Sequence, residues 1–266
     1  MIEICEVGPC EENLTPETKI EFIQRLVDSG MKTIEVIAFS QQNADSEEML
    51  KALPKSDGIS FAGLVCNRSE LERALNTSID TIRIAIALDG EIKDAVKAGV
   101  CLVKESVAAN RDAVAVLEMA FGTPSQGAIP VKRVVDASET LMEAGASGIT
   151  LADTTGVANP LQVAKVVHMF RARFGDDVRL GLHFHNTRGL ALANVFASYQ
   201  AGARIFDSSL AGIGANTGGN VCTEDMVHMF EQMNVRTNTN LTALIDTARW
   251  LERKLGRTLA GMMMKL

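Results

Sequence analysis

The feature that most constrains the fold of this chain is a series of eight short apolar runs that alternate with helical stretches along its 266 residues. Their near-continuous hydrophobicity is typical of strands that are buried on both faces of a parallel sheet. The runs are Ile2–Val7, Thr33–Phe39, Ile59–Val65, Thr81–Ala87, Ala113–Met119, Gly148–Leu151, Val178–His183 and Arg204–Ser208. Eight strands of similar spacing predict a TIM (β/α)8 barrel of the α/β class.

The stretches between the runs carry helix signals. The first is the clearest, because Thr15 can cap it, Pro16 suits its first position and Gly30 can end it. Further helices are expected at Ser46–Ala52, Arg68–Leu75, Pro130–Ala144, Pro160–Phe174, Leu190–Ala201 and Thr223–Met233, with a tail helix at Leu241–Leu255. In Asp89–Asn110, Gly99 interrupts the helical pattern, and no boundaries can be placed.

Because no low-complexity linker interrupts the repeat, we expect a single domain over residues 1–266 with a C-terminal helix. The alternative fold is a doubly wound open sheet. It is disfavoured because eight evenly spaced strands close naturally, and because no Gly-x-Gly-x-x-Gly follows the first run.

Composition excludes several classes of protein. With 26 Lys and Arg against 33 Asp and Glu, the net charge is −7, and the chain lacks the basic excess of a nucleic-acid-binding protein. No apolar stretch approaches the roughly 18 residues of a membrane helix. Five scattered cysteines without CxxC spacing fit reduced thiols. We therefore expect a cytoplasmic protein, with the apolar tail helix favouring a homo-oligomer.

The strongest chemical feature is the pair His183-x-His185 at the end of the seventh run. Residues two apart on a strand project from one face, so both imidazoles would point into the barrel mouth, where active sites of this fold form. Glu11 and Asn220 follow the neighbouring first and eighth runs and can add oxygen ligands. This donor set suits Mg²⁺, Mn²⁺ or Zn²⁺, whereas the histidine pair alone is also consistent with a polar rim.

Two further acidic residues are candidates for catalysis. Asp153 ends the sixth run, where it would orient a metal ligand or act as a base. However, Asp-Thr-Thr-Gly before a helix is also an ordinary turn and cap. Glu35 lies within an apolar run and needs a partner to be tolerated there, which favours a functional role.

Several blocks in a fixed order along the chain carry a family resemblance. They are Glu6–Pro9, Ile34–Val36, Ala120–Pro124, Leu151–Gly156, His183–Gly189, Asp207–Gly214 and Gly219–Asp225. Together they resemble the 3-hydroxy-3-methylglutaryl-CoA lyases of the DRE-TIM metallolyase superfamily. The resemblance implies a divalent cation, Mg²⁺ or Mn²⁺ before Zn²⁺, held by Glu11, His183, His185 and Asn220. It implies an acyl-CoA substrate, proton transfer by His183, and supporting roles for Asp153 and Glu35.

The first motif departs from the family pattern. Gly8-Pro9 is followed by Cys10 and Glu11, where the family has arginine and the ligand aspartate. The loop is also shorter, so Glu12 stays open as the alternative ligand. The family's arginine is thought to stabilise the enolate oxygen that forms during cleavage, and a thiol lacks that fixed charge. Arg188 is a candidate substitute cation.

The Gly-rich loop after the eighth run departs as well, because Ala215–Thr217 stands where the family has a reactive cysteine. We therefore expect a divalent-metal-dependent carbon–carbon lyase with an altered substrate, which cleaves a 3-hydroxy acyl-CoA or a related hydroxy acid. One alternative is a condensing synthase of the same superfamily that joins an acyl-CoA to a 2-oxo acid. The other is a non-catalytic, metal-binding descendant.

Overall fold

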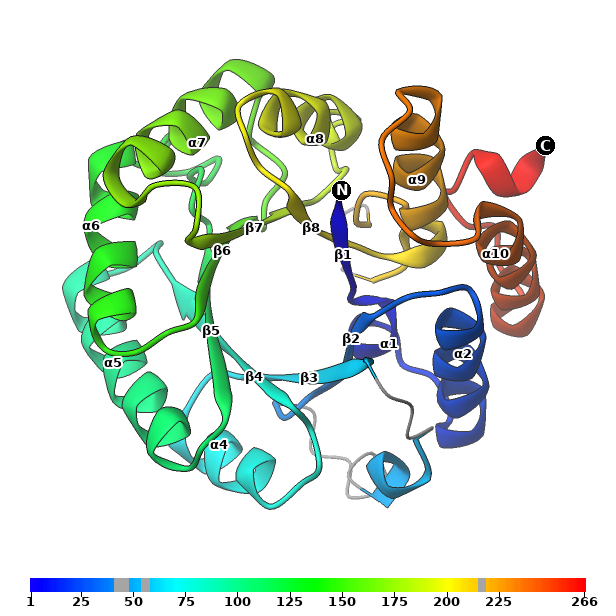
Figure 1. Cartoon of the computed structure of the whole chain (residues 1–266), viewed down its shortest axis with the longest axis horizontal. Coiled ribbons are helices and arrows are strands. Elements are labelled where there is room, and N and C mark those ends of the chain that lie inside the picture. The colour runs from blue at the N-terminus through cyan, green and yellow to red at the C-terminus, as the bar shows by residue number, and fades with distance from the viewer. Residues whose placement is uncertain (41–47, 54–57, 215–218) are drawn as a thin grey trace.

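The computed structural model describes residues 1–40, 48–53, 58–214 and 219–266. Within these ranges, eight parallel strands form a closed barrel in which each strand pairs with the next and β8 pairs with β1 (Figure 1). The strands are β1 (Glu3–Glu6), β2 (Thr33–Ala38), β3 (Ser60–Val65), β4 (Thr81–Ala87), β5 (Asp112–Glu118), β6 (Gly148–Asp153), β7 (Arg179–Phe184) and β8 (Ile205–Ser208). The predicted TIM barrel is confirmed.

Helices surround the barrel (Figure 1). They are α1 (Gly8–Glu11), α2 (Pro16–Asp28), α4 (Arg68–Leu75), α5 (Ile92–Ala108), α6 (Val131–Glu143), α7 (Pro160–Phe174), α8 (Ala191–Gln200), α9 (Thr223–Gln232) and α10 (Leu241–Leu255), with short 3₁₀ helices η1 (Leu50–Ala52), η2 (Leu210–Gly212) and η3 (Met263–Lys265). Part of the helix predicted at Ser46–Ala52 lies outside the described residues. No helix within the described ranges is long and apolar enough to cross a membrane.

The segment without predicted boundaries is one continuous helix, α5. Gly99 lies within it on the face that packs against β4, where an added Cβ would lie 2.4 Å from Cδ1 of Ile86. The glycine therefore does not break the helix. It allows the helix to approach the barrel closely, which a sequence pattern does not reveal.

The barrel register decides which side chains meet at the mouth. His183 on β7, Asp207 on β8 and Cys5 on β1 are lateral neighbours across three adjacent strands. On β2 the register with β3 shifts between Glu35 and Ile37, so the ladder between these two strands is irregular there. The sheet thus brings residues from both ends of the sequence together at one seam.

Candidate active site

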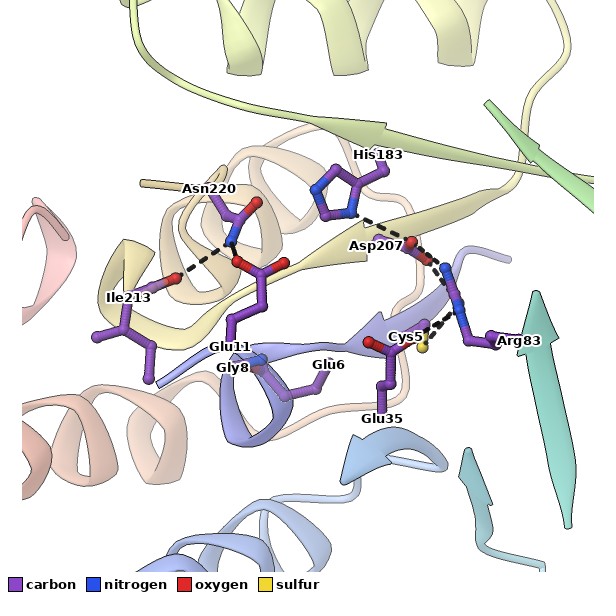
Figure 2. A network of polar contacts seen from close by, with 10 residues as sticks. All are labelled: Cys5, Glu6, Gly8, Glu11, Glu35, Arg83, His183, Asp207, Ile213 and Asn220. Atoms are coloured by element: carbon purple, nitrogen blue, oxygen red, sulfur yellow. Dashed lines mark hydrogen bonds and ion pairs between the residues drawn. The ribbon is translucent and has the colours of Figure 1, made fainter. Parts of the chain in front are cut away.

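Three predicted metal-ligating residues meet at the barrel mouth. Glu11 in α1, His183 in β7 and His185 just after β7 each offer a ligand atom, and these atoms all lie within 4.8 Å of one another. Asn220 lies beside them, because its Nδ2 donates to Oε2 of Glu11 at 2.8 Å and to the carbonyl of Ile213 at 3.1 Å (Figure 2). The four residues expected to share a cation therefore form one cluster.

The donor atoms of this cluster suit a divalent cation. Oδ1 of Asn220 is buried and has no hydrogen-bond partner among the described residues. Such an atom is costly unless something else satisfies it. Burial, with the nearby charge of His183, lowers the pKa of His185 to about 3, so this imidazole is neutral, as a metal ligand must be.

His183 is oriented by Asp207. Nδ1 of His183 lies 3.3 Å from Oδ2 of Asp207, and Figure 2 shows the other ring nitrogen on the side of Asn220 and Glu11. Burial alone would lower the pKa of His183, but its hydrogen bond with Asp207 and the Asp207 charge raise it above its ordinary value. A carboxylate behind an imidazole fixes the ring and leaves Nε2 facing the site.

The partner that the buried Glu35 requires is Arg83 on β4. Nε of Arg83 and Oε2 of Glu35 are 2.7 Å apart, and both side chains are buried. Glu35 also forms a hydrogen bond with the thiol of Cys10, which is itself buried. Burial raises the pKa of Cys10 well above its usual range. The thiol in the place of the family's arginine is therefore neutral and bound to Glu35.

Glu12, the alternative ligand, and Arg188, the candidate substitute cation, are held by contacts away from the cluster. Oε2 of Glu12 accepts a hydrogen bond from Arg257 at 2.6 Å, so this carboxylate faces the segment after α10. Arg188 donates to the carbonyls of Thr155 and Gly156, at 2.7 and 3.0 Å. Glu11 thus lies nearer the histidines than its neighbour, and Arg188 is held by the turn after β6.

Asp153 has the contacts of a turn residue. Its Oδ1 accepts from the N–H of Val157 at 2.9 Å and its Oδ2 from the N–H of Ala158 at 3.0 Å. Both oxygens therefore stabilise the segment that leads into α7. The turn interpretation accounts for these contacts, and the catalytic role of Asp153 stays a prediction.

Two buried acids behind the cluster hold the loops together. Oε1 of Glu6 accepts from the N–H groups of Gly8, at 3.0 Å, and Leu210, at 2.8 Å. Oε2 of Glu224 accepts from the N–H of Ala211 at 2.9 Å. Burial raises the pKa of Glu6 to about 7 and that of Glu224 to about 8. These contacts join the start of α1 to the loop after β8. They therefore hold Glu11, in α1, close to Asn220, which lies at the end of that loop.

Sequence analysis gave no role to three further residues at the site, namely Arg83, Glu118 and Asp207. Arg83 lies within the apolar run Thr81–Ala87, so the argument that Glu35 needs a partner applies equally to it. Glu118 ends β5, and burial raises its pKa while the charge of His183 opposes the shift. The signal for each was a charged residue within or at the end of a buried strand.

Comparison with known proteins identifies the family. The HMGL-like family model matches residues 9–251, which is most of the chain and includes the four residues of the cluster. The chain belongs to the HMGL-like family. The substitution at Ala215–Thr217 lies outside the described residues.

Relatives of this HMGL-like chain are carbon–carbon lyases. It is 34% identical to the hydroxymethylglutaryl-CoA lyase YngG of Bacillus subtilis, over 97% of this chain and 94% of that protein. It is 32% identical to the (R)-citramalyl-CoA lyase of Chloroflexus aurantiacus, over 95% of this chain and 88% of that protein. The expected class of enzyme, a carbon–carbon lyase, is thereby confirmed.

Solved structures of the family share the whole fold. The HMG-CoA lyase of Bacillus subtilis superposes with a TM-score of 0.93 at 32% identity, covering 99% of this chain and 97% of that one. An HMG-CoA lyase from Acinetobacter baumannii, solved with coenzyme A and 3-methylmalate, gives a TM-score of 0.92 at 30% identity, covering 100% and 94%. Coenzyme A is thus bound by that Acinetobacter baumannii enzyme, whose fold this chain shares.

Proposed function

We propose that this protein is a divalent-metal-dependent lyase that cleaves the bond between C2 and C3 of a 3-hydroxyacyl-CoA. In this proposal Glu11, His183, His185 and Asn220 hold Mg²⁺ or Mn²⁺, with Zn²⁺ as the alternative. The observation that carries it is the convergence of two imidazoles and a carboxylate beside a buried amide oxygen that lacks a partner among the described residues.

A bound divalent cation would polarise the hydroxyl and carbonyl oxygens of a chelating substrate and lower the pKa of the hydroxyl. The residues of the chain then have to move the proton. Three groups at the mouth have a raised pKa, namely His183, Glu118 and Asp153. Because Nδ1 of His183 is engaged by Asp207, proton transfer by His183 would use Nε2. The ligand assignment uses the same nitrogen, which cannot hold a cation and a proton at once, so the two roles of His183 are alternatives that an experiment can distinguish.

The relatives define the substrate class to test. One is named for 3-hydroxy-3-methylglutaryl-CoA and the other for (R)-citramalyl-CoA. These thioesters share a hydroxyl, a methyl and a carboxylate-bearing arm on C3, and they differ by one methylene in that arm. Cleavage of either releases acetyl-CoA, together with acetoacetate in the first case and pyruvate in the second.

The test uses the full chain, stripped with a chelator and then loaded with Mg²⁺ or Mn²⁺. Acetyl-CoA release from each thioester is followed by mass spectrometry, and the second product identifies the substrate. We expect turnover with at least one thioester and none without metal. If neither thioester is cleaved, the lyase proposal is wrong, and incubation of acetyl-CoA with 2-oxo acids then tests the condensing direction. A homo-oligomeric state and a cytoplasmic location stay predictions.

A further inference from the structure

The middle of this barrel is filled by a charged side chain. In TIM barrels the interior is usually filled by layers of bulky aliphatic residues. Here Arg83 projects into a space shared with Ala62, Thr150 and Gly181, which are small. At position 181 an added Cβ would lie 2.6 Å from Oγ1 of Thr150, so the layer has no room for a larger residue there. The small neighbours accommodate one large guanidinium.

Arg83 reaches across the barrel, because β4 lies opposite β8 in the closed order of strands. Its Nε pairs with Oε2 of Glu35 at 2.7 Å, and its Nη1 donates to Oδ1 of Asp207 at 3.2 Å. Its Nη2 donates to Oδ2 of Asp207, and Nη1 also lies 3.3 Å from Sγ of Cys5 (Figure 2). The side chain is only 7% exposed. One cation thus binds two buried carboxylates, and its bond to Asp207 is bidentate.

The oxygen of Asp207 that Arg83 binds is the oxygen that faces His183. Oδ2 of Asp207 accepts a hydrogen bond from Nη2 of Arg83 and lies 3.3 Å from Nδ1 of His183. A planar guanidinium in a bidentate contact fixes both the position and the rotation of a carboxylate. The orientation of the imidazole at the mouth therefore depends on a residue from the opposite wall of the barrel.

We propose that Arg83 is a positioning residue of the active site, which holds Asp207 so that Nδ1–H of His183 donates to it and Nε2 faces the cation. This inference rests on the proposed function for the identity of the cation. Without Arg83, Glu35 and Asp207 would be two buried carboxylates without their shared countercharge, and such groups shift or take up protons. Asp207 would then no longer be held against His183.

A cavity that borders this layer makes the position of Arg83 more critical. It has a volume of about 410 Å³ and is lined by the first residues of the strands, by Arg83 and by Asp207. The Arg83–Asp207 pair therefore lies between the mouth and this cavity at the opposite end of the barrel. A shorter side chain at position 83 would open Asp207 to water from that side.

The test compares Arg83→Met and Arg83→Lys with Arg111→Met. Arg111 is a suitable control, because it is a half-buried arginine that donates to the carbonyls of Thr77 and Ile79, at 2.7 and 2.9 Å, in the turns beneath β4. Its loss should lower the melting temperature without touching the site. Two readouts are needed, namely the Mn²⁺ dissociation constant by calorimetry and the ¹⁵N shifts of the His183 ring in the metal-free protein.

We expect Arg83→Met to weaken Mn²⁺ binding about 10–100-fold, as loss of outer-shell partners does in metal sites. It should also shift the His183 nitrogens away from the Nδ1–H form. Arg83→Lys should show an intermediate loss, because an ammonium cannot span both carboxylates, and it replaces Arg83→Met if that variant does not fold. Arg111→Met should bind Mn²⁺ within twofold of the unmodified chain.

Unchanged Mn²⁺ affinity and unchanged His183 shifts in a folded Arg83 variant would overturn the inference. An equal loss of affinity in Arg111→Met would overturn it too, because the effect would then follow stability. If the unmodified chain does not bind Mn²⁺, the proposed function fails in its metal requirement. The His183 shifts of the metal-free variants would still decide whether Arg83 orients this ring.

Discussion

Substitution of Glu11 by glutamine tests the metal site with the least change in shape. Among the four proposed ligand residues, Glu11 is the one carboxylate, and at least one of the two imidazoles is neutral. At an effective dielectric constant of 20, a single charge about 4 Å from a dication interacts with it by roughly 8 kcal/mol before desolvation is subtracted. Changes outside the ligand shell already cost about 10–100-fold in affinity. The loss of Glu11 should therefore cost at least about 100-fold, or about 2.7 kcal/mol.

Glu12→Gln is the matched control for this measurement. Glu12 is adjacent to Glu11 in the sequence, but its carboxylate pairs with Arg257 at 2.6 Å. Calorimetric titration with Mn²⁺ at neutral pH should give an unchanged dissociation constant for Glu12→Gln and a much weaker one for Glu11→Gln. Equal losses in both variants, or normal binding by Glu11→Gln, would refute the assignment of Glu11 and reopen Glu12 as the ligand.

Three further predictions concern proton transfer, pH and thiol chemistry. His183→Ala should abolish turnover; if it binds Mn²⁺ normally, His183 moves the proton, and if it loses Mn²⁺, His183 is a ligand. The pKa of Glu224 is raised to about 8 in the folded chain from 4.5, so the folded state holds a proton that the unfolded state has released. The unfolding free energy in urea should therefore fall as pH rises from about 4.5 to 8, by up to roughly 1.4 kcal/mol per pH unit from this group. Glu224→Gln should reduce this dependence of the unfolding free energy on pH, and an unaltered dependence would contradict the raised pKa of Glu224. Iodoacetamide should modify the exposed Cys66 and Cys101 before the buried thiols, as peptide mass spectrometry can check.

The architecture was predictable because its signal is repeated. Each strand had to be apolar on both faces and each helix needed caps, so local errors of one or two residues did not change the fold. Thr15 caps α2 as expected, accepting from the N–H of Thr18 at 3.3 Å. The exception was α5, where Gly99 contacts Ile86 on β4. A tertiary contact of this kind leaves no periodic trace in the sequence.

The site was predictable where residue type and strand position sufficed, as for His183 and His185. The site was not predictable where it depends on a contact across the barrel, because the sequence does not show which strand a side chain reaches. Arg83 and Asp207 are 124 positions apart in the chain, and only closure of the sheet brings them into contact. The two interpretations of Asp153 differed in hydrogen-bond partners, which a sequence does not supply.

The hydrogen bond between Asn220 and Glu11 spans 209 positions and crosses the seam where β8 meets β1. During synthesis the ribosome delivers Glu11 before β8 and Asn220, so a nascent chain with seven strands lacks part of the ligand set proposed for the ion. Because metal affinity requires a formed site, high-affinity binding of the ion would follow closure of the barrel. Ion occupancy would then mark chains in which β8 and Asn220 have joined the barrel, and scarcity of the ion would leave earlier assembly of the strands unaffected.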